Sequence, residues 1–239
     1  MFTPKSTFTD DTVLTMANAL WLLEDDQHTP ETLVRIMLDM CRKYPGRGYG
    51  GRFAHWIQSS LPQPYNSFGN GSAMRVSPVG YYATTLDEAL ELAKISAEVT
   101  HNHPEGIKGA QATAAAIFLA RQGKTKREIR KYIEKTFQYD LDCTLEEIRP
   151  DYTFDETCQR TVPEAFTCYR EGKDYEDVVR LAVSLAADAD TLAAIAGSIA
   201  SATMDVPNEI VQKVISLLSE EFCTLLLRFN ELVTKREAL

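Results

Sequence analysis

The sequence predicts an all-α protein, an orthogonal bundle of amphipathic helices. Apolar residues recur with the helical spacing of three and four positions in one segment after another. No segment alternates apolar and polar residues in the way that predicts a strand. Two segments, 109–120 and 182–202, are crowded with Ala, Gly and Ser, which let backbones approach closely at the centre of such a bundle.

The first two helices are located by their starts and by their apolar faces. The first begins at Thr9-Asp10, residues that favour an N-cap. Its apolar face consists of Val13, Met16, Ala17, Leu20 and Trp21. The second has Thr29 as its N-cap and Pro30 in its first turn, and it ends before Pro45-Gly46. Its apolar face consists of Leu33, Ile36, Met37, Met40 and Cys41.

The segment from Pro45 to Pro78 shows no sustained period. It is rich in Gly, Pro, Asn and Ser, and only Phe53, Trp56 and Ile57 indicate a short helix. Long irregular segments inside compact domains are commonly functional loops. Further helices are expected at 86–99, 104–122, 125–136, 161–170, 174–187, 190–203 and 207–233.

Length and charge bound the organisation and the partners of the protein. The chain has 239 residues, 44% of them apolar, which is enough for a sizeable core. We therefore expect a single domain over residues 1–239, with the polar stretch from Asp140 to Thr161 as the only candidate for an insertion or second lobe. The net charge of −9 is spread along the chain, which argues against a sequence-specific nucleic-acid partner and against an anionic-membrane face.

Cysteine usage and hydropathy indicate the compartment. The five cysteines form no Cys-x-x-Cys pair and most lie among apolar helical positions, which predicts reduced, buried thiols. The N-terminal sequence MFTPKSTFTDD lacks the apolar core of a signal peptide, and no apolar stretch is long enough to span a bilayer. We expect a cytoplasmic protein without a membrane partner, and the oligomeric state stays open.

Two acidic clusters carry the strongest chemical signal. Thr9-Asp10-Asp11 offers two carboxylates and a hydroxyl, the hard oxygen ligands that Mg²⁺ or Mn²⁺ prefers. Simple capping of the first helix is the alternative, because Thr and Asp are favoured there. Asp188-Ala189-Asp190-Thr191 joins two nearly apolar helices, where carboxylates need a cation, either a metal ion or an Arg or Lys side chain.

A glycine-containing loop and a histidine are candidates for binding an anion. The loop runs from Ser67 to Arg75, and its Gly-Asn-Gly core can take positive φ and expose backbone N–H groups. An ordinary Asn-Gly turn is the alternative. His101 precedes the helix that starts at Pro104 and is expected to contact a phosphate or a sugar, with a surface histidine as the alternative.

Five segments in chain order resemble the successive motifs of the ADP-ribosylglycohydrolase family, over Phe8 to about Pro207. They are FTDDTVLTMANAL, SFGNGSAMRVSPVGYY, SAEVTHNHPEGIKGAQATAAAIFLA, TVPEAFTCY and SLAADADTLAAIAGSIASA. The resemblance implies the all-α orthogonal bundle of that family with a two-metal site. It also implies hydrolysis of an N- or O-glycosidic bond at ribose C1″, which releases ADP-ribose from a modified side chain, arginine first, or from a small-molecule conjugate.

The resemblance also assigns residues to roles. Thr9, Asp10 and Asp11 would ligate one Mg²⁺ or Mn²⁺, Asp188 and Thr191 the other, and Asp190 would touch both. Asp10, Asp11 and Asp190 would be the catalytic residues, because the two cations would orient the 2′- and 3′-hydroxyls of the ribose and polarise a water. The pyrophosphate and the distal parts of ADP-ribose would be held by Ser67, Gly69, Asn70, Gly71, Ser72 and His101.

The chain departs from the family pattern in two places. Members usually carry a helix with an acidic residue ahead of the Phe-Thr-Asp-Asp motif, whereas Thr9 has only eight residues before it, and Glu98 and Glu105 are the candidate substitutes. Ala186-Ala187 stands where the family favours Gly-Gly, and the two methyl groups restrict the backbone. Two alternatives to an active hydrolase therefore stay open: a catalytically weak ADP-ribose-binding protein, and a structural protein on the same scaffold.

Overall fold

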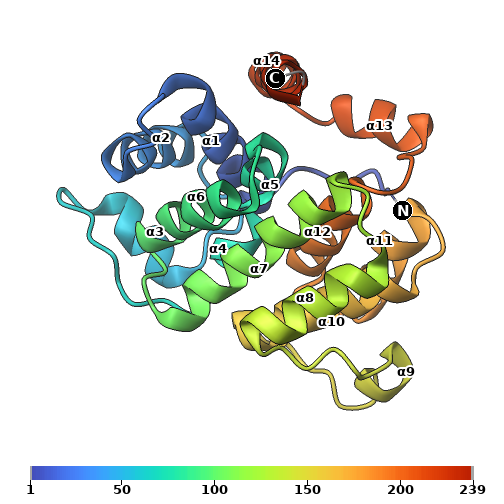
Figure 1. Ribbon diagram of the computed structural model, residues 1–239. Helices are drawn as coiled ribbons and strands as arrows, with labels where there is room; N and C mark the ends of the chain where they lie inside the picture. Colours follow the sequence, from blue (N-terminus) through green and yellow to red (C-terminus); the bar gives the residue numbers. More distant parts are fainter. Residues whose placement is uncertain (1, 238–239) are drawn as a thin grey trace.

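The computed structural model describes residues 2–237, and within them it contains helices and no sheet (Figure 1). The all-α class is therefore confirmed. The nearest approach to a strand within this range is an isolated bridge between Gly69 and Thr157. The helices are α1 (Asp10–Glu24), α2 (Pro30–Lys43), α3 (Gly51–Gln58), α4 (Gly71–Met74), α5 (Ser77–Tyr82), α6 (Leu86–Glu98), α7 (Pro104–Arg121), α8 (Lys126–Phe137), α9 (Leu145–Ile148), α10 (Cys158–Glu171), α11 (Tyr175–Ser184), α12 (Ala189–Ala200), α13 (Asn208–Ile215) and α14 (Glu220–Glu237). The predicted domain of residues 1–239 includes residues 1 and 238–239, which lie outside the described part.

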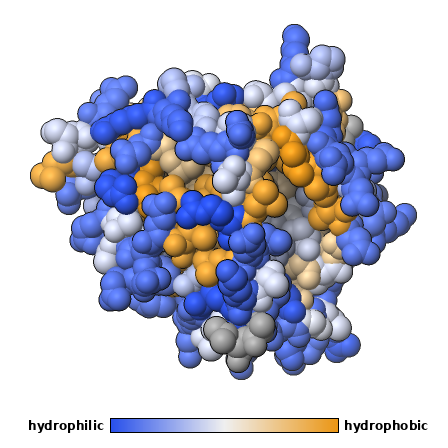
Figure 2. Space-filling view, turned by 90° about the horizontal axis from the view of Figure 1, so that it is seen from above, coloured by the Kyte–Doolittle hydropathy of each residue, from blue (hydrophilic) through white to orange (hydrophobic). Residues whose placement is uncertain are grey.

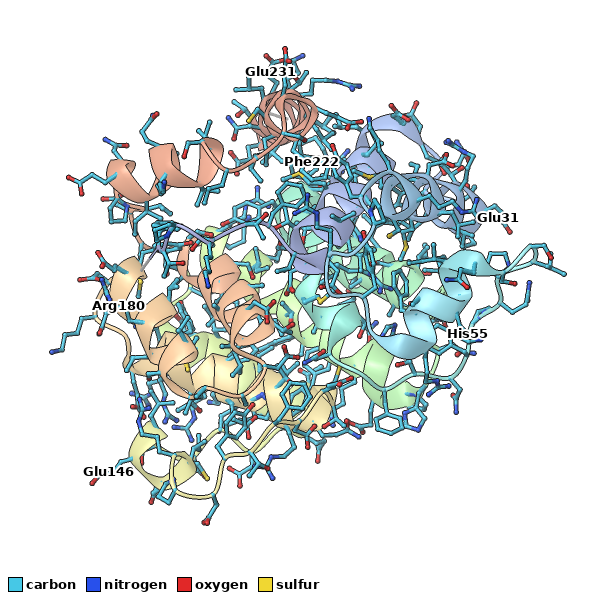
Figure 3. The ribbon with its side chains drawn as sticks, turned by 180° about the vertical axis from the view of Figure 1, so that it is seen from behind. Glu31, His55, Glu146, Arg180, Phe222 and Glu231 are labelled. Carbon is cyan, nitrogen blue, oxygen red and sulfur yellow. The ribbon has the colours of Figure 1, made fainter. Side chains whose placement is uncertain are left out.

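One half of the bundle is built on α1, α2, α6 and α14. The predicted apolar faces of α1 and α2 are buried except for Leu20, which is partly buried, and Trp21 and Leu33 are wholly enclosed. α14 lies across α1, and its Phe222 points inward against Phe8 and Tyr44, with ring centroids 5.4 and 4.7 Å away. Glu231 lies on the outer side of the same helix (Figure 3). The first apolar core therefore joins the beginning of the chain to its last helix.

The other half is built on α8, α10, α11 and α12, with α7 between the halves (Figure 1). Ala110 and Ala114 on α7 belong to the first core, whereas Ala112, Ala116 and other residues of α7 belong to the second. Small side chains on both faces let helices pack closely on either side of α7. α7 therefore contributes to both apolar cores. The starts of α1 and α12 come from opposite halves of the bundle.

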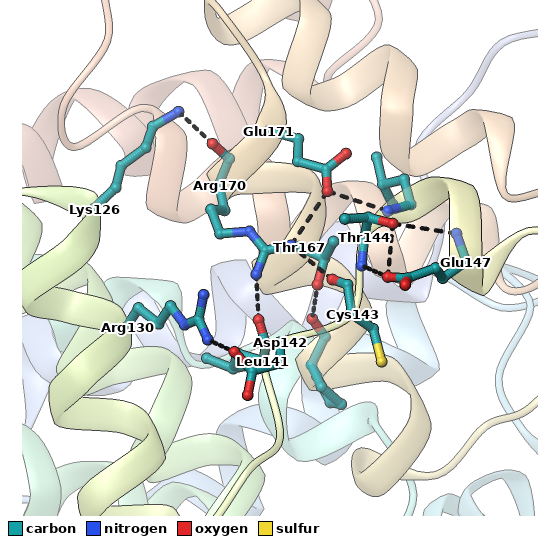
Figure 4. A network of polar contacts seen from close by, with 12 residues as sticks. Lys126, Arg130, Leu141, Asp142, Cys143, Thr144, Glu147, Thr167, Arg170 and Glu171 are labelled. Atoms are coloured by element: carbon teal, nitrogen blue, oxygen red, sulfur yellow. Dashed lines mark hydrogen bonds and ion pairs between the residues drawn. The ribbon is translucent and has the colours of Figure 1, made fainter.

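The polar stretch predicted as an insertion is tied to the second half (Figure 4). The Arg170 guanidinium on α10 donates to the carbonyls of Leu141 and Cys143, and Arg130 on α8 pairs with Asp142. Asp155 then accepts a hydrogen bond from the Thr157 N–H at 2.7 Å, immediately before α10. These contacts fix both ends of a loop that returns toward α4.

Several predicted boundaries were wrong, for identifiable reasons. α4, α5 and α9 are too short, at four to six residues, to show a helical period. α10 begins at Cys158 rather than 161, so Pro163, typical of a first turn, lies inside the helix. The helix predicted at 207–233 is two helices, α13 and α14, because the Ser219 hydroxyl accepts the Phe222 N–H and starts a new one.

The side of the molecule that carries α13 and α14 has apolar side chains open among charged ones (Figure 2). Val214, Ile215 and Leu227 are exposed there, and α13 buries none of its residues. Over residues 2–237 no helix combines the length and the apolar character needed to cross a membrane.

Candidate functional site

A cavity of about 570 Å³ lies where the starts of α1 and α12 face each other, and the loop before α4 forms its floor. With the exception of Ser72, all the site residues predicted from the sequence line it. They are Thr9, Asp10, Asp11, Ser67, Gly69, Asn70, Gly71, His101, Asp188, Asp190 and Thr191. The structure therefore brings together segments that lie far apart in the sequence, from Thr9 to Thr191.

Thr9, Asp10 and Asp11 occupy the start of α1, but the side chain at the N-cap position, Thr9, does not cap it. Thr9 is the N-cap residue, yet its side chain accepts no amide hydrogen bond from the helix. Its hydroxyl donates instead to Asp11 Oδ2 at 3.1 Å. Asp11 is buried, and its Oδ1 has no hydrogen-bond partner in the described part of the chain. The capping alternative thus fails for the Thr9 side chain.

Asp188, Asp190 and Thr191 occupy the start of α12 in the same manner. Asp188 is the N-cap residue and again makes no side-chain cap. Its Oδ2 accepts a hydrogen bond of 2.7 Å from Asn70 Nδ2, which also donates to Thr161 Oγ1 at 3.0 Å. Thr191 is buried, and the Asp190 carboxylate lies at the open edge of the cavity. Asn70 thereby links the glycine loop to the second acidic cluster.

Burial and mutual repulsion raise the pKa values of three of these carboxyl groups. Burial is the largest cause in each case, and repulsion from Asp190 adds to it. The pKa is about 6 for Asp10, about 7 for Asp11 and about 6 for Asp188. Within residues 2–237 no three His, Cys, Asp or Glu side chains are gathered closely enough to form a ready metal-binding group. The two clusters face each other as repelling charges.

The loop from Ser67 to Arg75 differs from its prediction. Neither glycine of the Gly-Asn-Gly core has positive φ. The Gly69 N–H donates to Ser67 Oγ, and the Asn70 N–H donates to the Glu156 carbonyl at 2.6 Å, so these two amides are committed within the protein. The predicted ligand contact of Ser72 is not supported, because its buried hydroxyl donates to the Gly106 carbonyl at 2.7 Å and holds the loop against α7.

Gly69 and Gly71 allow the loop to approach His101 closely, and neither is needed for a positive φ. A Cβ on Gly71 would lie 3.2 Å from His101 Nε2, and one on Gly69 would lie 3.5 Å from the same atom. His101 is buried, with Nδ1 2.7 Å from Thr100 Oγ1, so the surface alternative is excluded for this residue. His103 is the N-cap of α7, and its Nδ1 accepts the Glu105 N–H. This amide at the start of α7 is therefore committed within the protein.

The cavity contains residues that sequence reasoning missed. Arg47, Arg52 and Arg75 bring positive charge to it, and Phe154 and Glu156 come from the loop before α10. Arg75 ends the loop that the sequence singled out but was given no role there, and the other four residues stand in no recognisable motif. The loop that contains Arg47 places Gly48 beside Asp10 Oδ1, where a Cβ would be only 3.2 Å away. The candidate acids Glu98 and Glu105 do not line the cavity, and Glu105 instead pairs with Lys108 at 3.0 Å.

Known proteins resemble this chain along most of its length. A family model described as ADP-ribosylglycohydrolase matches residues 2–237. ADP-ribosylhydrolase ARH3 of Gallus gallus is 30% identical over 158 residues, which are 60% of this chain and 41% of that protein. ADP-ribosylarginine hydrolase Tri1 of Pseudomonas putida (strain GB-1) is 30% identical over 161 residues, 61% of this chain and 42% of that protein. The matched segments thus span less than half the length of these relatives.

A solved structure shows the same fold. It is titled ADP-ribosylglycohydrolase-related protein complex and superposes with a TM-score of 0.73 at 23% sequence identity. The match covers 94% of this chain and 81% of the other. The match of the family model to residues 2–237 and this shared helical architecture lead to one conclusion: the chain belongs to the ADP-ribosylglycohydrolase family.

Proposed function

We propose that the protein hydrolyses the glycosidic bond at ribose C1″ and releases ADP-ribose from an ADP-ribosylated protein side chain or from a small-molecule conjugate. Two divalent cations, Mg²⁺ or Mn²⁺, would be its cofactors. Thr9, Asp10 and Asp11 would hold one, Asp188 and Thr191 the other, and Asp190 would contact both. The relatives named ADP-ribosylhydrolase and ADP-ribosylarginine hydrolase support this reaction class.

The observation that carries the proposal is the convergence of four carboxylates on one cavity, at two helix starts whose N-cap side chains make no cap. Asp10 and Asp11 start α1, and Asp188 and Asp190 start α12. Like charges brought together by burial are costly, and a divalent cation removes that cost while using the same oxygen atoms. The orphaned Asp11 Oδ1 is a further oxygen that a cation would satisfy.

The donor set fits hard divalent cations. All the candidate ligands are carboxylate or hydroxyl oxygens, and Mg²⁺ commonly keeps several waters, so few protein ligands are needed for each ion. Bound cations of this kind orient hydroxyls and lower the pKa of a water. The protein's own residues would then enclose the ligand, with His101 and the Gly69–Gly71 loop on the pyrophosphate side of the cavity.

The carboxylates at the exposed edge of the cavity support arginine as the acceptor, although three arginines also line the cavity. The Asp190 and Glu156 carboxylates lie at this edge, and the protein carries a net charge of −9. A positively charged guanidinium leaving group is attracted to such carboxylates, whereas a neutral serine hydroxyl gains nothing from them. We propose ADP-ribosylated arginine as the first substrate class.

A second candidate function is binding of ADP-ribose without turnover. Glu98 and Glu105 lie outside the cavity, so neither supplies an acid beyond the four proposed ligands. Glu156 is the carboxylate at the cavity that lies outside both acidic clusters. If the native chain releases ADP-ribose from a modified peptide and Glu156→Gln binds that peptide without release, the transfer of a proton to the leaving group would be assigned to Glu156.

The test is release of ADP-ribose from two peptides, one modified on arginine and one on serine, with Mg²⁺, with Mn²⁺ and with excess chelator. The proposal predicts release from the arginine peptide that requires a cation. Binding of either peptide without release under all three conditions would favour the second candidate. Equal release in the presence of chelator would overturn the role given to the cations.

A further inference from the structure

Arg75 is a buried cation that the proposed reaction does not explain. The residue has no exposed surface, and its Nη2 donates to the Ser96 carbonyl at 2.6 Å and to Thr100 Oγ1 at 2.9 Å. Within the described residues its Nε and Nη1 have no hydrogen-bond partner and no carboxylate pairs with it. An unpaired buried charge is costly, so its retention beside a ligand cavity calls for a reason.

The contacts of Thr100 fix the direction of its hydrogen bonds. A guanidinium can only donate, so Thr100 Oγ1 accepts from Arg75. The single hydroxyl proton of Thr100 is then available to His101 Nδ1, 2.7 Å away. If Nδ1 donated instead, Thr100 would accept twice and its own proton would have no acceptor among the contacts of this buried hydroxyl in residues 2–237. The arrangement that satisfies all three groups has Nδ1 as the acceptor.

Charge and burial exclude the doubly protonated ring. Burial is the main cause that holds the pKa of His101 well below its usual range, and the neighbouring Arg75 and Arg52 charges lower it further. The ring is therefore neutral with one proton. Because Nδ1 accepts from Thr100, that proton lies on Nε2.

His101 Nε2 lies over the glycine loop at the cavity. Side chains on Gly69 or Gly71 would cover it, because their Cβ atoms would lie 3.5 and 3.2 Å from Nε2. His101 lines the cavity, so the Nε2–H has an open path to a bound ligand. Phosphate oxygens accept hydrogen bonds and do not donate them at neutral pH, so they require this tautomer and would be repelled by the other.

We propose that Arg75 and Thr100 are positioning residues that hold His101 as the neutral Nε2–H tautomer, ready to donate to a phosphate oxygen of the ligand. The inference rests on the proposed function for the identity of that ligand. The unneutralised Arg75 charge also favours an anion in the cavity. This chain of hydrogen bonds explains why Arg75, at the end of α4, contacts Thr100, which lies with His101 between α6 and α7.

The test starts with the free protein, so that it does not depend on ADP-ribose. Nitrogen-15 spectra distinguish the two ring nitrogens of a neutral histidine, and the chain has only four histidines. The His101 signals are identified by their loss in His101→Ala. The expected result for the native chain and for Thr100→Ser is a protonated Nε2 and an unprotonated Nδ1. Thr100→Val removes the hydroxyl that donates to Nδ1, so the signal of the unprotonated Nδ1 is expected to move toward the position of a ring nitrogen that accepts no hydrogen bond.

Thr113→Val is the matched control, because Thr113 is also fully buried and donates within α7 to the Gly109 carbonyl, away from His101. Titration of ADP-ribose with Mg²⁺ present should show about ten- to a hundredfold weaker binding for Thr100→Val, the worth of a hydrogen bond to a charged group. Thr113→Val should bind as the native chain does.

The outcomes separate this inference from the proposed function. A native His101 that is protonated on Nδ1, or an unchanged Nδ1 signal in Thr100→Val, overturns the inference. Unchanged affinity in a Thr100→Val protein whose Nδ1 signal has moved also overturns it. If the native chain shows the Nε2–H tautomer but does not bind ADP-ribose, the proposed function fails while the positioning role of Arg75 and Thr100 stands.

Discussion

At the scale of single residues, the starts of α1 and α12 differ from most other helix starts with a Thr or Asp N-cap. The side chains of Thr29, Thr85, Thr125, Thr144 and Asp174 each accept an amide hydrogen bond from their own helix. Thr9 and Asp188 occupy the same position in α1 and α12 and do not, and neither does Thr157 in α10. The sequence cannot distinguish the two groups, because the residue types are the same.

The exposed Asp190 provides the sharpest single-residue prediction. Asp190→Ala should lower cation-dependent release of ADP-ribose by roughly a hundredfold or more, since even outer partners of metal ligands contribute ten- to a hundredfold. Its unfolding temperature in chelator should not fall, because removing one charge lessens the repulsion on Asp11. Asp87→Ala, an exposed acid in the first turn of α6, is the control. Unchanged turnover in Asp190→Ala would contradict the assigned site.

Ala186 provides a stability prediction at the entrance to the second cluster. Its φ of 63° is left-handed, which disfavours a residue with a Cβ and matches the glycine expected there. Ala186→Gly should raise the free energy of unfolding by about 1 kcal/mol, or the unfolding temperature by about 2–4 °C. Thermal melts are the measurement. Ala187→Gly, at a position without positive φ, should give no increase, and an equal gain in both variants would contradict the explanation.

At the scale of elements, close helix crossings position the loop that carries Phe154 and Glu156. α7 and α10 meet at Gly109, where an added Cβ would lie 2.4 Å from Cys158 Sγ. Cys158 begins α10, and its N–H donates to the Phe68 carbonyl at 2.9 Å. Packing at this crossing is thus coupled to the glycine loop on the cavity floor.

Gly109→Ala should therefore lower the free energy of unfolding by about 1–3 kcal/mol, the usual cost of overpacking a tight contact. It should also weaken ADP-ribose binding, because α10 and the loop before it must move. Chemical denaturation measures the first effect, and titration calorimetry the second. Gly51→Ala is the matched control for stability, since its Cβ would meet nothing within 4 Å. An unchanged free energy of unfolding in Gly109→Ala would show that α10 is not held at this crossing.

Long elements were predictable from the sequence, and short or interrupted ones were not. The apolar faces of α1 and α2 fixed their positions because periodicity over several turns outweighs local ambiguity. α4 and α9 are single turns, too short for a period to appear, although a capping box of Thr144 and Glu147 starts α9. The break between α13 and α14 depends on the Ser219 hydroxyl, which accepts the Phe222 N–H and starts a new helix.

At the scale of the whole molecule, the candidate site was only partly predictable. The acids were found because two carboxylates beside a hydroxyl stand out even in isolation. Arg47 and Glu156 reach the cavity through the fold alone, from segments without a motif, and Arg75 lies within a motif whose spacing assigns it no role. The single domain, the compartment and the oligomeric state stay predictions or open questions, because they do not follow from the fold.

The coupling between charge and cations predicts a pH dependence of the whole protein. The folded-state pKa values of Asp10, Asp11 and Asp188 lie above the ordinary value of 3.8, so without cations their ionisation lowers the free energy of unfolding as pH rises from about 4 to 7. Cations bind the ionised form. The rise in unfolding temperature on adding Mg²⁺ or Mn²⁺ should therefore be small near about pH 5 and larger near about pH 7.5.

Thermal melts across this range, with cation and with chelator, measure the effect. Asp11→Asn removes the carboxyl group with the highest of the three pKa values and should flatten the dependence. A cation effect that is independent of pH in the native chain would contradict the coupling.

The most direct test of the composite site is a calorimetric titration of ADP-ribose into this chain, once with Mg²⁺ or Mn²⁺ and once with excess chelator. The account predicts binding that depends on the cation, because the carboxylates of α1 and α12 repel an anionic ligand until a cation neutralises them. Equal binding in chelator, or no binding in either condition, would contradict it.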